Sequence, residues 1–574
     1  MNARWWTVAR IAAVAAVMVI AVQLVDAGYE YGFGEQMLLS LKGISWADPQ
    51  ALVNDWFNDQ APQPHILFDV VTFIGEKTGL RPQMYFLYWL SSIVIAASAI
   101  VMLSKKWLPR RAQPFELLAG AMLVTGPYFA LGTFLLVHRE AVPNGLGGAM
   151  GFLTATLLLV RRDRAALIAA GVTTVVHVQH GAVVAVLLLA VWALDPGRRR
   201  GALKWYPLAI GLILAAVYAV AAVRGLVAGT GDISAVCETA SPGHCDPDSW
   251  VWPVIRDGVV VVLLGAAAPL LARSRRWRDV AVLAAPALVA LGALVTDLAD
   301  IEPFQSLGRQ FFLYRFVMVV APFAVMSIVV ALTRPLTPDL PPAGRWRAWA
   351  WCVGGAAAFV VWHLLTYATI GRFRAGTGGV RVATVLIAVT IVIALAGWLL
   401  LTRVRRAPTE RAEPWVLAGL AVAVVAVLLG FGSRATGAIP LRVDYRPDDG
   451  GVALGRAIEE ATPPGSVIVV RPDYAWFRLL SRRALVVDCK GVPYGGEPWQ
   501  EYNERLAALG VSTPLECSNA GFVAMDLDDI GDVAERYGGT HVFLEPDDRA
   551  YEDAEDEWER VTGEPGQGGV FVIP

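Results

Sequence analysis

The chain has 574 residues, with 48 Lys and Arg against 50 Asp and Glu, and this balance gives no indication of nucleic-acid binding. Hydrophobic residues make up 56% and charged residues 17%, and the mean hydropathy is +0.51. Such values exclude an ordinary soluble protein of this length. The composition therefore predicts a protein embedded in a lipid bilayer.

Long apolar runs recur between Ile11 and Gly432, and charged or Pro/Gly-rich breaks separate them. A bilayer core of about 30 Å requires roughly 20 apolar residues in a helix, because no backbone polar group can stay unsatisfied there. The first run has a basic start and no small-residue cleavage site, so we expect an uncleaved anchor. We expect about thirteen transmembrane helices, at residues 8–26, 84–103, 115–137, 146–160, 165–178, 181–194, 204–222, 256–272, 279–298, 311–332, 348–370, 382–402 and 414–432.

Basic residues occur in every second loop between these segments. Because Lys and Arg concentrate in cytoplasmic loops, the alternation predicts a cytoplasmic N-terminus and an extracytoplasmic C-terminal tail. One outer loop, with Arg372, Arg374 and Arg381, departs from the pattern. Either the topology slips there or these arginines serve an anion. The basic loops contain Lys105, Lys106, Arg110 and Arg111; Arg161, Arg162 and Arg164; Arg198 to Arg200; Arg273, Arg275, Arg276 and Arg278; Arg345 and Arg347; and Arg403, Arg405 and Arg406.

Two of the outer segments are long. Residues 29–83 are too polar to cross a membrane but rich in aromatic residues, which predicts short amphipathic helices on the membrane surface. The segment around residues 223–256 contains Cys237 and Cys245, and an oxidising compartment favours a disulfide between them over two free thiols. Cys489 and Cys517 in the tail could form a second bridge.

The tail alternates apolar β-prone runs with helical patterns, which predicts a small α/β domain with a largely parallel sheet. We expect the Gly-rich stretch from Gly450 to Gly455 to be a turn rather than a nucleotide-binding loop. The predicted fold is thus an all-α membrane domain over residues 1–432 and an extracytoplasmic α/β domain over 433–574. The predicted strands are 466–470, 484–488, 541–545 and 569–573, and the predicted helices are 473–483, 498–509 and 526–537.

The first outer loop carries acidic residues beside aromatic ones, most densely at Asp55, Trp56 and Phe57. A carboxylate at the membrane surface can hold a divalent cation on a phosphate or accept a proton from a hydroxyl. Glu30, Glu35 and His65 could converge on the same place. The alternative is that these are solvated side chains on interfacial helices.

Two further groups lie near the outer ends of predicted spans. His177 and His180 stand three apart between two short apolar segments, and ionisable residues at membrane depth suggest a function. His138 to Glu140 give a weaker signal of the same kind. Arg309 and Arg315 lie at the outer end of the tenth predicted span, with Arg315 about one turn inside it, where a buried arginine requires an anionic partner. That partner is either a lipid phosphate or a nearby carboxylate, at Asp297, Asp300 or Glu302.

These features resemble the GT-C superfamily of membrane glycosyltransferases, and more closely an uncharacterised family of bacterial GT-C-like membrane proteins. The motifs that carry the resemblance are Tyr31-Gly32 with Gln36, Asn54-Asp55-Trp56-Phe57, His177 with His180-Gly181, and the tail motif from Phe477 to Pro493. The Gly-rich start of the fourth span, Gly145 to Gly151, is instead typical of close helix packing.

The resemblance implies polyprenyl-phosphate sugars as donors and catalysis on the outer face. Asp55 would be the catalytic or metal-holding acid, with Mg²⁺ or Mn²⁺ as the metal, and His177, His180 and Arg315 would contact the donor phosphate. The tail lacks the Trp-Trp-Asp motif of oligosaccharyltransferases, so peptide glycosylation is not expected. Asp488 and Lys490 are either acceptor contacts or a structural pair.

We therefore expect a glycosyltransferase of the bacterial plasma membrane, with an envelope glycan or lipid as acceptor. The alternative is a transporter, flippase or assembly scaffold for lipid-linked precursors. A transporter should show two repeated halves with interrupted helices, and the sequence shows no such repeat.

Overall fold

The computed structural model describes most of the chain outside residues 335–449. The described residues are 3–25, 29–61, 64–125, 129–134, 140–195, 201–223, 230–272, 276–334, 350, 353–355, 357–358, 443–445, 450–493, 496–563 and 568–574. The expected helices 382–402 and 414–432, nearly all of 348–370, and the exceptional arginines Arg372, Arg374 and Arg381 lie outside the described residues.

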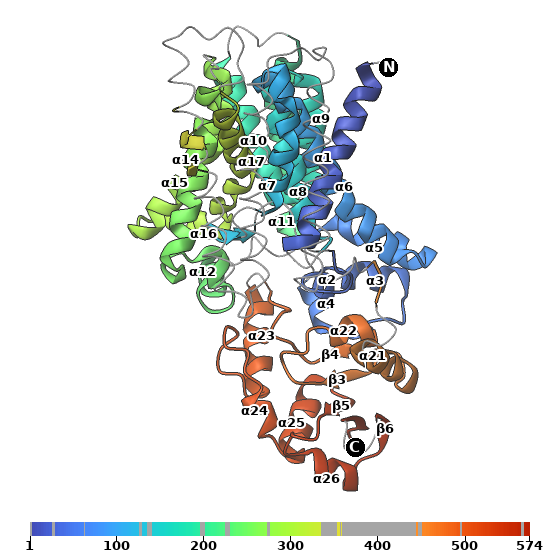
Figure 1. Cartoon of the computed structure of the whole chain (residues 1–574). Helices are drawn as coiled ribbons and strands as arrows, with labels where there is room; N and C mark the ends of the chain where they lie inside the picture. Colours follow the sequence, from blue (N-terminus) through green and yellow to red (C-terminus); the bar gives the residue numbers. More distant parts are fainter. Residues whose placement is uncertain are drawn as a thin grey trace.

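A bundle of apolar helices forms the larger part of the molecule (Figure 1). Each of the ten segments expected before residue 333 contains one of these helices. They are α1 (Ala3–Val25), α6 (Arg81–Trp107), α7 (Glu116–Thr125), α8 (Pro143–Leu159), α9 (Asp163–Val176), α10 (Val178–Leu194), α11 (Tyr206–Val223), α14 (Trp252–Leu271), α15 (Trp277–Leu298) and α17 (Val317–Leu332).

Six helical stretches among the described residues are long and apolar enough to cross a bilayer. The remaining bundle helices, α7, α8, α9 and α10, are shorter and have 10 to 17 residues. The chain is thus a polytopic membrane protein with several spans, and the expected total of thirteen stays a prediction.

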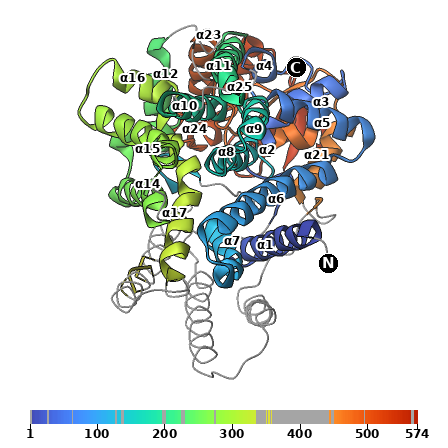
Figure 2. The ribbon, with the colours of Figure 1, turned by 90° about the horizontal axis from the view of Figure 1, so that it is seen from above.

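Helix α17 is the most deeply buried of the described bundle helices, since all its residues from Val317 to Leu332 are buried. It packs against α14, α7, α8 and α15, and the view from above shows α14 directly beside it (Figure 2). Small residues allow the closest approaches. A Cβ at Gly265 of α14 would lie within 2.5 Å of the backbone oxygen of Val320, and one at Gly151 of α8 would lie 3.0 Å from the side chain of Val319.

Short elements cover the end of the bundle that faces the tail (Figure 1). Four helices lie in the first outer loop, as its amphipathic pattern predicted. The elements between the bundle helices are α2 (Gln36–Leu39), α3 (Leu41–Ala47), α4 (Trp56–Gln60), α5 (Ile66–Thr78), α12 (Thr230–Thr239), α13 (Pro242–Cys245) and α16 (Phe304–Gln310), the 3-10 helices η1 (Arg110–Phe115), η3 (Gly201–Trp205), η4 (Pro247–Ser249) and η5 (Leu313–Phe316), and the hairpin β1 (Phe129–Ala130) with β2 (Thr133–Phe134).

The tail folds around one five-stranded sheet in the order β4-β3-β5-β7-β6. Strand β3 pairs in parallel with β4 and β5, whereas β7 pairs antiparallel with β5 and β6. The sheet is therefore mixed rather than largely parallel as expected. Its elements are α21 (Gly450–Ala461), β3 (Val467–Val469), α22 (Phe477–Ser481), β4 (Ala484–Leu485), α23 (Gly496–Ala508), α24 (Ala520–Val523), α25 (Leu527–Tyr537), β5 (His541–Leu544), α26 (Tyr551–Glu557), β6 (Arg560–Gly563) and β7 (Gly569–Val572).

The turn expected at Gly450 to Gly455 is wrong, because these residues begin helix α21. The helix buries one face through Val452, Gly455 and Ile458. Gly455 is needed there, because a Cβ at this position would lie about 2.5 Å from the Cβ of Leu480 in α22.

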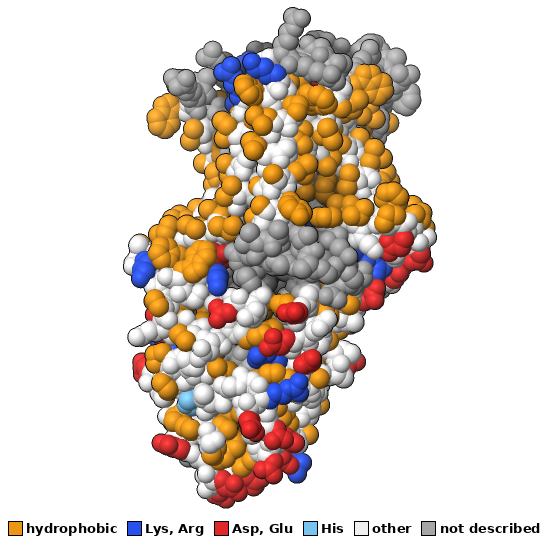
Figure 3. All heavy atoms as spheres, turned by 180° about the vertical axis from the view of Figure 1, so that it is seen from behind, with side chains coloured by type: hydrophobic (Ala, Val, Ile, Leu, Met, Phe, Trp, Pro, Cys, Tyr) orange, Lys and Arg blue, Asp and Glu red, His pale blue; other side chains and the backbone are white. Residues whose placement is uncertain are grey.

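The ends of the molecule differ in charge. The N-terminus lies at the end of the bundle away from the tail (Figure 1). Lys105, Arg161 and Arg276, from three loops expected to be cytoplasmic, line one cavity near the start of α1. From behind, hydrophobic side chains cover the bundle and acidic ones are frequent over the tail (Figure 3). The loops that the charge pattern assigned to one side therefore do meet at one end of the bundle.

Candidate functional site

The first outer loop and the tail share one hydrophobic core. Leu41, Ile44 and Phe57 from the loop pack in the same buried cluster as Val469 and Val486 from the tail sheet. Such a shared core fixes the tail against the loop, and through the loop against the membrane bundle.

Asp55 lies at the centre of this contact and is completely buried. Its Oδ1 accepts the backbone N–H of Asn58 at 2.8 Å, which caps helix α4. Its Oδ2 accepts hydrogen bonds from Nε–H of Arg478 at 2.7 Å and from the backbone N–H of Leu485 at 3.2 Å. Arg478 is itself only 1% exposed and also pairs with Asp488.

Oδ2 of Asp55 therefore holds the tail to the loop, while Oδ1 caps helix α4 within the loop. A divalent cation does not fit at this carboxylate, because the guanidinium of Arg478 already supplies the positive charge there. The catalytic role that the sequence predicted for Asp55 stays a prediction. Neighbouring bonds strengthen the same contact, since the backbone N–H of Leu52 donates to the carbonyl of Arg482 at 2.9 Å and Asn54 donates to the carbonyl of Gly465 at 3.1 Å.

His65, His177 and His180 come together beneath this loop. The ring centroids of His65 and His177 are 4.9 Å apart, and those of His177 and His180 are 4.7 Å apart. The Nε2 of His180 is 3.0 Å from Oδ1 of Asn144 at the start of α8. Among the described residues, no group forms a hydrogen bond with Nδ1 of His177.

Gly147 on α8, which has no side chain, makes room for these histidines. A Cβ at Gly147 would lie 2.6 Å from Cδ2 of His180 and 2.9 Å from Cβ of His177. The Gly-rich start of this helix thus packs closely, as its composition predicted, and its neighbour is the turn between α9 and α10.

The histidines lie at membrane depth. Helix α9 starts at the basic end of the bundle and has 14 residues, so it spans about 21 Å. This length is less than the bilayer core of about 30 Å. If α9 starts at one boundary of the core, we expect the turn at His177 to lie inside the core, towards the side of the tail.

Arg315, on η5, lies beside the histidine cluster. Its Nη1 donates to Oε1 of Gln179 at 3.1 Å, and its guanidinium stacks 4.4 Å from the ring centroid of Phe312. The carboxylates that the sequence offered as partners take other donors. Asp297 accepts a hydrogen bond from Arg309, Asp300 accepts one from Gln305, and Glu302 accepts one from Ser306.

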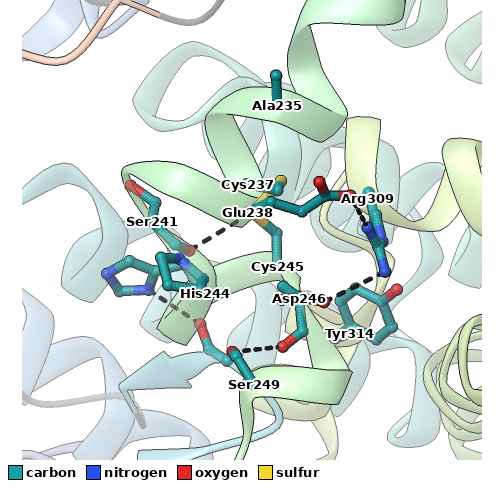
Figure 4. The surroundings of a disulfide bond; sticks show 12 residues. Ala235, Cys237, Glu238, Ser241, His244, Cys245, Asp246, Ser249, Arg309 and Tyr314 are labelled. Carbon is teal, nitrogen blue, oxygen red and sulfur yellow. Dashed lines mark hydrogen bonds and ion pairs between the residues drawn. A yellow bond between two sulfur atoms is a disulfide. The ribbon is translucent and has the colours of Figure 1, made fainter. Parts of the chain in front are cut away.

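Arg309 lies in a separate acidic cluster beside α12 and α13 (Figure 4). It pairs with Asp297 at 3.0 Å, with Glu238 at 2.8 Å and with Asp246 at 3.2 Å. Asp246, Asp248 and Asp297 could hold a metal ion, since ligand atoms of all three lie within 4.8 Å of one another. Arg309 contacts all three carboxylates, however, and it already supplies a positive charge to them.

Two disulfides lie on the side of the tail. Cys237 bonds to Cys245 beside the Arg309 cluster (Figure 4), which is the pairing that the sequence favoured. Cys489 bonds to Cys517 within the tail, which is the second bridge that the sequence allowed.

Glu140 faces the same region from the loop before α8. Burial of its carboxyl and the nearby charge of Glu35 raise the pKa of Glu140 to about 8, although Lys490 of the tail lowers it. The backbone N–H of Gln36 lies 3.5 Å from Oε2 of Glu140. Gly34, with φ +62°, has no Cβ, and one at this position would overlap the Glu140 carboxylate.

The charges of both Arg315 and Glu35 act on His244. Its Nδ1 lies 3.1 Å from the carbonyl oxygen of Gly132. Burial and the charge of Arg315 lower the pKa of His244, whereas Glu35 raises it. Arg315 also acts electrostatically on His177. The charge of Arg315 thus acts on both His177 and His244, and the charge of Glu35 acts on both His244 and Glu140, so these groups form one electrostatic network.

This network, which we call the junction cluster, contains His65, His177, His180, Arg315 and Glu35 from the predicted site. Of the two further members, Glu140 gave only a weak signal in the sequence, and His244 was missed. Glu30 is half-buried at the start of the outer loop, and Arg309 lies in its own acidic cluster.

Two solved structures of membrane proteins match this chain at low similarity. The structure of ArnT from Cupriavidus metallidurans bound to undecaprenyl phosphate matches with a TM-score of 0.46 and 15% identity, covering 100% of this chain and 99% of that one. The archaeal oligosaccharyltransferase AglB from Archaeoglobus fulgidus, in complex with an inhibitory peptide and a dolichol-phosphate, matches with a TM-score of 0.37 and 10% identity, covering 94% and 69%. At such scores and identities the likeness transfers neither an activity nor a residue role.

One family of domains of unknown function, DUF6798, matches residues 451–509. This part of the tail contains Arg478, Asp488 and Lys490. No curated protein matches the chain.

Proposed function

We propose that this protein is a membrane glycosyltransferase that transfers a sugar from a polyprenyl-phosphate donor to an envelope glycan or lipid acceptor on the outer face. The observation that carries the proposal is the junction cluster. It combines cationic and imidazole groups at membrane depth with a carboxyl group whose pKa is raised to about 8.

The orientation in this proposal has two independent supports. Basic loops gather at the end of the bundle that holds the N-terminus, and such loops stay in the cytoplasm. Both disulfides lie on the opposite side, where an oxidising compartment would maintain them. In a bacterial plasma membrane the tail and the junction cluster would therefore face outward.

A lipid phosphate would bind at Arg315 and the histidines. A guanidinium forms two parallel hydrogen bonds to phosphate oxygens, and imidazole N–H groups can donate further bonds. The depth of His177 suits a donor whose prenyl chain lies in the bilayer and whose phosphate lies at its surface.

Glu140 would accept the proton of the acceptor hydroxyl. The acceptor oxygen forms a bond to the anomeric carbon of the sugar, and the bond from that carbon to the phosphate oxygen breaks. The electron pair leaves with the polyprenyl phosphate, whose charge Arg315 stabilises. A base works best when its pKa is near the working pH, and a pKa of about 8 meets this condition.

Asp55 is the alternative base that the family resemblance implies. Its two oxygens are engaged with Asn58, Leu485 and Arg478, so we assign it to anchoring the tail. Comparing variants at Asp55 and Glu140 therefore separates two mechanisms of the same reaction.

A carrier of lipid-linked precursors is the second candidate. Helices α9 and α10, with 14 and 17 residues, are short hydrophobic segments that meet at His177, and transporters use short hydrophobic segments at substrate sites. A carrier would bind the donor but would not cleave it.

The test uses the full-length protein in lipid nanodiscs with a panel of radiolabelled polyprenyl-phosphate sugars. Binding and sugar transfer are measured for the wild type and for Glu140→Gln, Asp55→Asn and the exposed control Glu552→Gln. Transfer by the wild type and the control, lost in Glu140→Gln with donor binding retained, supports the proposal. Loss only in Asp55→Asn, with the fold retained, would move the base to Asp55. Binding without transfer by the wild type would favour the carrier, and no binding would contradict both.

A further inference from the structure

The cavity near the start of α1 lies at the end of the bundle away from the tail, far from the junction cluster. Its volume is about 860 Å³, and its walls come from α1, α6, the turn between α8 and α9, and the start of α15. Ligand pockets in proteins typically measure about 300–1,000 Å³. The cavity is thus large enough for a lipid headgroup and the upper part of its acyl chains.

The rim of this cavity is basic. Its charged lining consists of Lys105, Lys106, Arg161, Arg162 and Arg276. The carboxylate of Asp279, just outside the lining, binds one of them, since Lys106 Nζ lies 2.8 Å from its Oδ2. The nearby Arg10 is already paired with Glu116. Lys105, Arg162 and Arg276 are exposed, so the rim keeps an excess of positive charge.

The floor of the cavity is apolar. Val8 and Ile11 of α1 face Val101 and Met102 of α6 across it. Trp5 and Val8 on α1 are 69% and 56% exposed, which is expected of side chains that face lipid. The site therefore joins a cationic rim to an apolar wall beside the bilayer.

The depth of the rim matches the headgroup layer. Helix α6 has 27 residues, which corresponds to about 40 Å, whereas the bilayer core is about 30 Å thick. Lys105 and Lys106 lie in its last turn. This turn therefore extends beyond the core to the level of the phosphate groups, and Lys105 is already oriented there by its bond of 2.7 Å to Oγ1 of Thr7.

We propose that this cavity binds the headgroup of an anionic phospholipid from the cytoplasmic leaflet. Clusters of Lys and Arg between transmembrane helices on that side bind such headgroups, and the acyl chains would lie on the apolar floor. The inference is independent of the proposed glycosyl transfer, because it uses no residue of the junction cluster.

The test measures lipid binding to the full-length protein by native mass spectrometry. The probes are phosphatidylglycerol, phosphatidylcholine with the same acyl chains, and soluble glycerol phosphate as a competitor. We expect phosphatidylglycerol to bind preferentially and glycerol phosphate to compete poorly, because it lacks the chains that contact the floor.

The variant is the double substitution Lys105→Ala and Arg162→Ala, and the matched control is Lys77→Ala and Arg536→Ala, which removes two exposed charges at the other end of the molecule. Each basic side chain should contribute about fivefold to affinity, so the double variant should bind roughly 25-fold more weakly. The control should bind as the wild type does, and a thermal unfolding scan of each protein verifies its fold.

Three results would overturn the proposal. They are equal binding of the two phospholipids, full competition by glycerol phosphate, and unchanged affinity in the folded double variant.

Discussion

Arg478 and Arg315 are both arginines on the side of the tail, but their surroundings differ. Arg478 is 1% exposed and lies between Asp55 and Asp488, so its charge is matched within the protein. Arg315 bonds to the neutral Gln179 and lies near His177 and His244. A guanidinium held between two buried carboxylates anchors structure, whereas the guanidinium of Arg315 lies at the histidine cluster, where the proposed donor phosphate would bind.

The same contrast separates Asp55 from Glu140. The oxygens of Asp55 accept two backbone N–H groups and one guanidinium group. Burial and Glu35 instead raise the pKa of Glu140, so its proton can be exchanged near neutral pH. We therefore expect substitutions around Asp55 to reduce stability and substitutions in the junction cluster to reduce activity.

The largest expected effect is on stability, in Arg478→Ala. This change leaves Asp55 and Asp488 buried without their cation, which should cost about 3–5 kcal/mol. Thermal or denaturant unfolding of the purified protein measures it. The control Arg536→Ala removes an exposed pair with Glu504 and should cost less than about 1 kcal/mol. If Arg478→Ala kept its stability but lost sugar transfer, the anchoring role would be wrong.

Glu140→Gln should slow sugar transfer by about 100-fold or more, because a positioned base contributes on that scale. The wild-type rate should rise with pH through about 8. The rate rises with pH because Glu140 acts as a base. Its carboxyl group cannot accept a proton while it is protonated, and it ionises only as the pH passes its raised pKa. The variant should lose this pH dependence. A parallel rise in both proteins would exclude Glu140 as the group that titrates.

Arg315→Gln should weaken donor binding by about tenfold to a hundredfold, because it removes a charge-assisted contact to phosphate. Equilibrium binding of a labelled polyprenyl-phosphate sugar measures this loss. Arg315→Lys keeps the charge without the planar fork and should retain part of the affinity. A loss of thermal stability as large as that of Arg478→Ala, with donor affinity unchanged, would instead place Arg315 among the structural ions.

The smallest effect is expected for Gly147→Ala. The added Cβ would press on His177 and His180, so donor affinity should fall a few-fold, at a cost in stability of about 1–3 kcal/mol. Gly171→Ala on α9 is the matched control, because among the described residues outside its own helix turn no atom lies within 4 Å of its added Cβ. Equal affinities in the two variants would show that the histidines do not require this spacing.

Local pattern was sufficient to predict the bundle. Each apolar run before residue 333 contains a helix, because the bilayer imposes the same length and hydrophobicity on every span. The tail was harder. Strand β6 (Arg560–Gly563) is a short edge strand without an apolar run, and the glycines of α21 concealed a helix that packs on Leu480.

The site could be predicted only in part, since its bonds join distant residues. His177 and His180 are close in sequence, so their cluster was visible. Asp55 and Arg478 are 423 positions apart, and nothing in either segment alone indicates that they neutralise each other. Sequence spacing likewise could not decide which arginine would pair with Asp297, and the structure assigns it to Arg309.

The ion pair between Asp55 and Arg478 also has a consequence for biosynthesis. A ribosome adding about 5–20 residues per second needs on the order of 20–85 s to make the 423 positions between the two partners. Throughout this interval the segment containing Asp55, Trp56 and Phe57 would lie on the outer side of the membrane before the tail that covers it has been made. The contact therefore forms only late in synthesis, and a protein truncated before Arg478 would leave Asp55 and its aromatic neighbours uncovered and accessible to quality-control proteases.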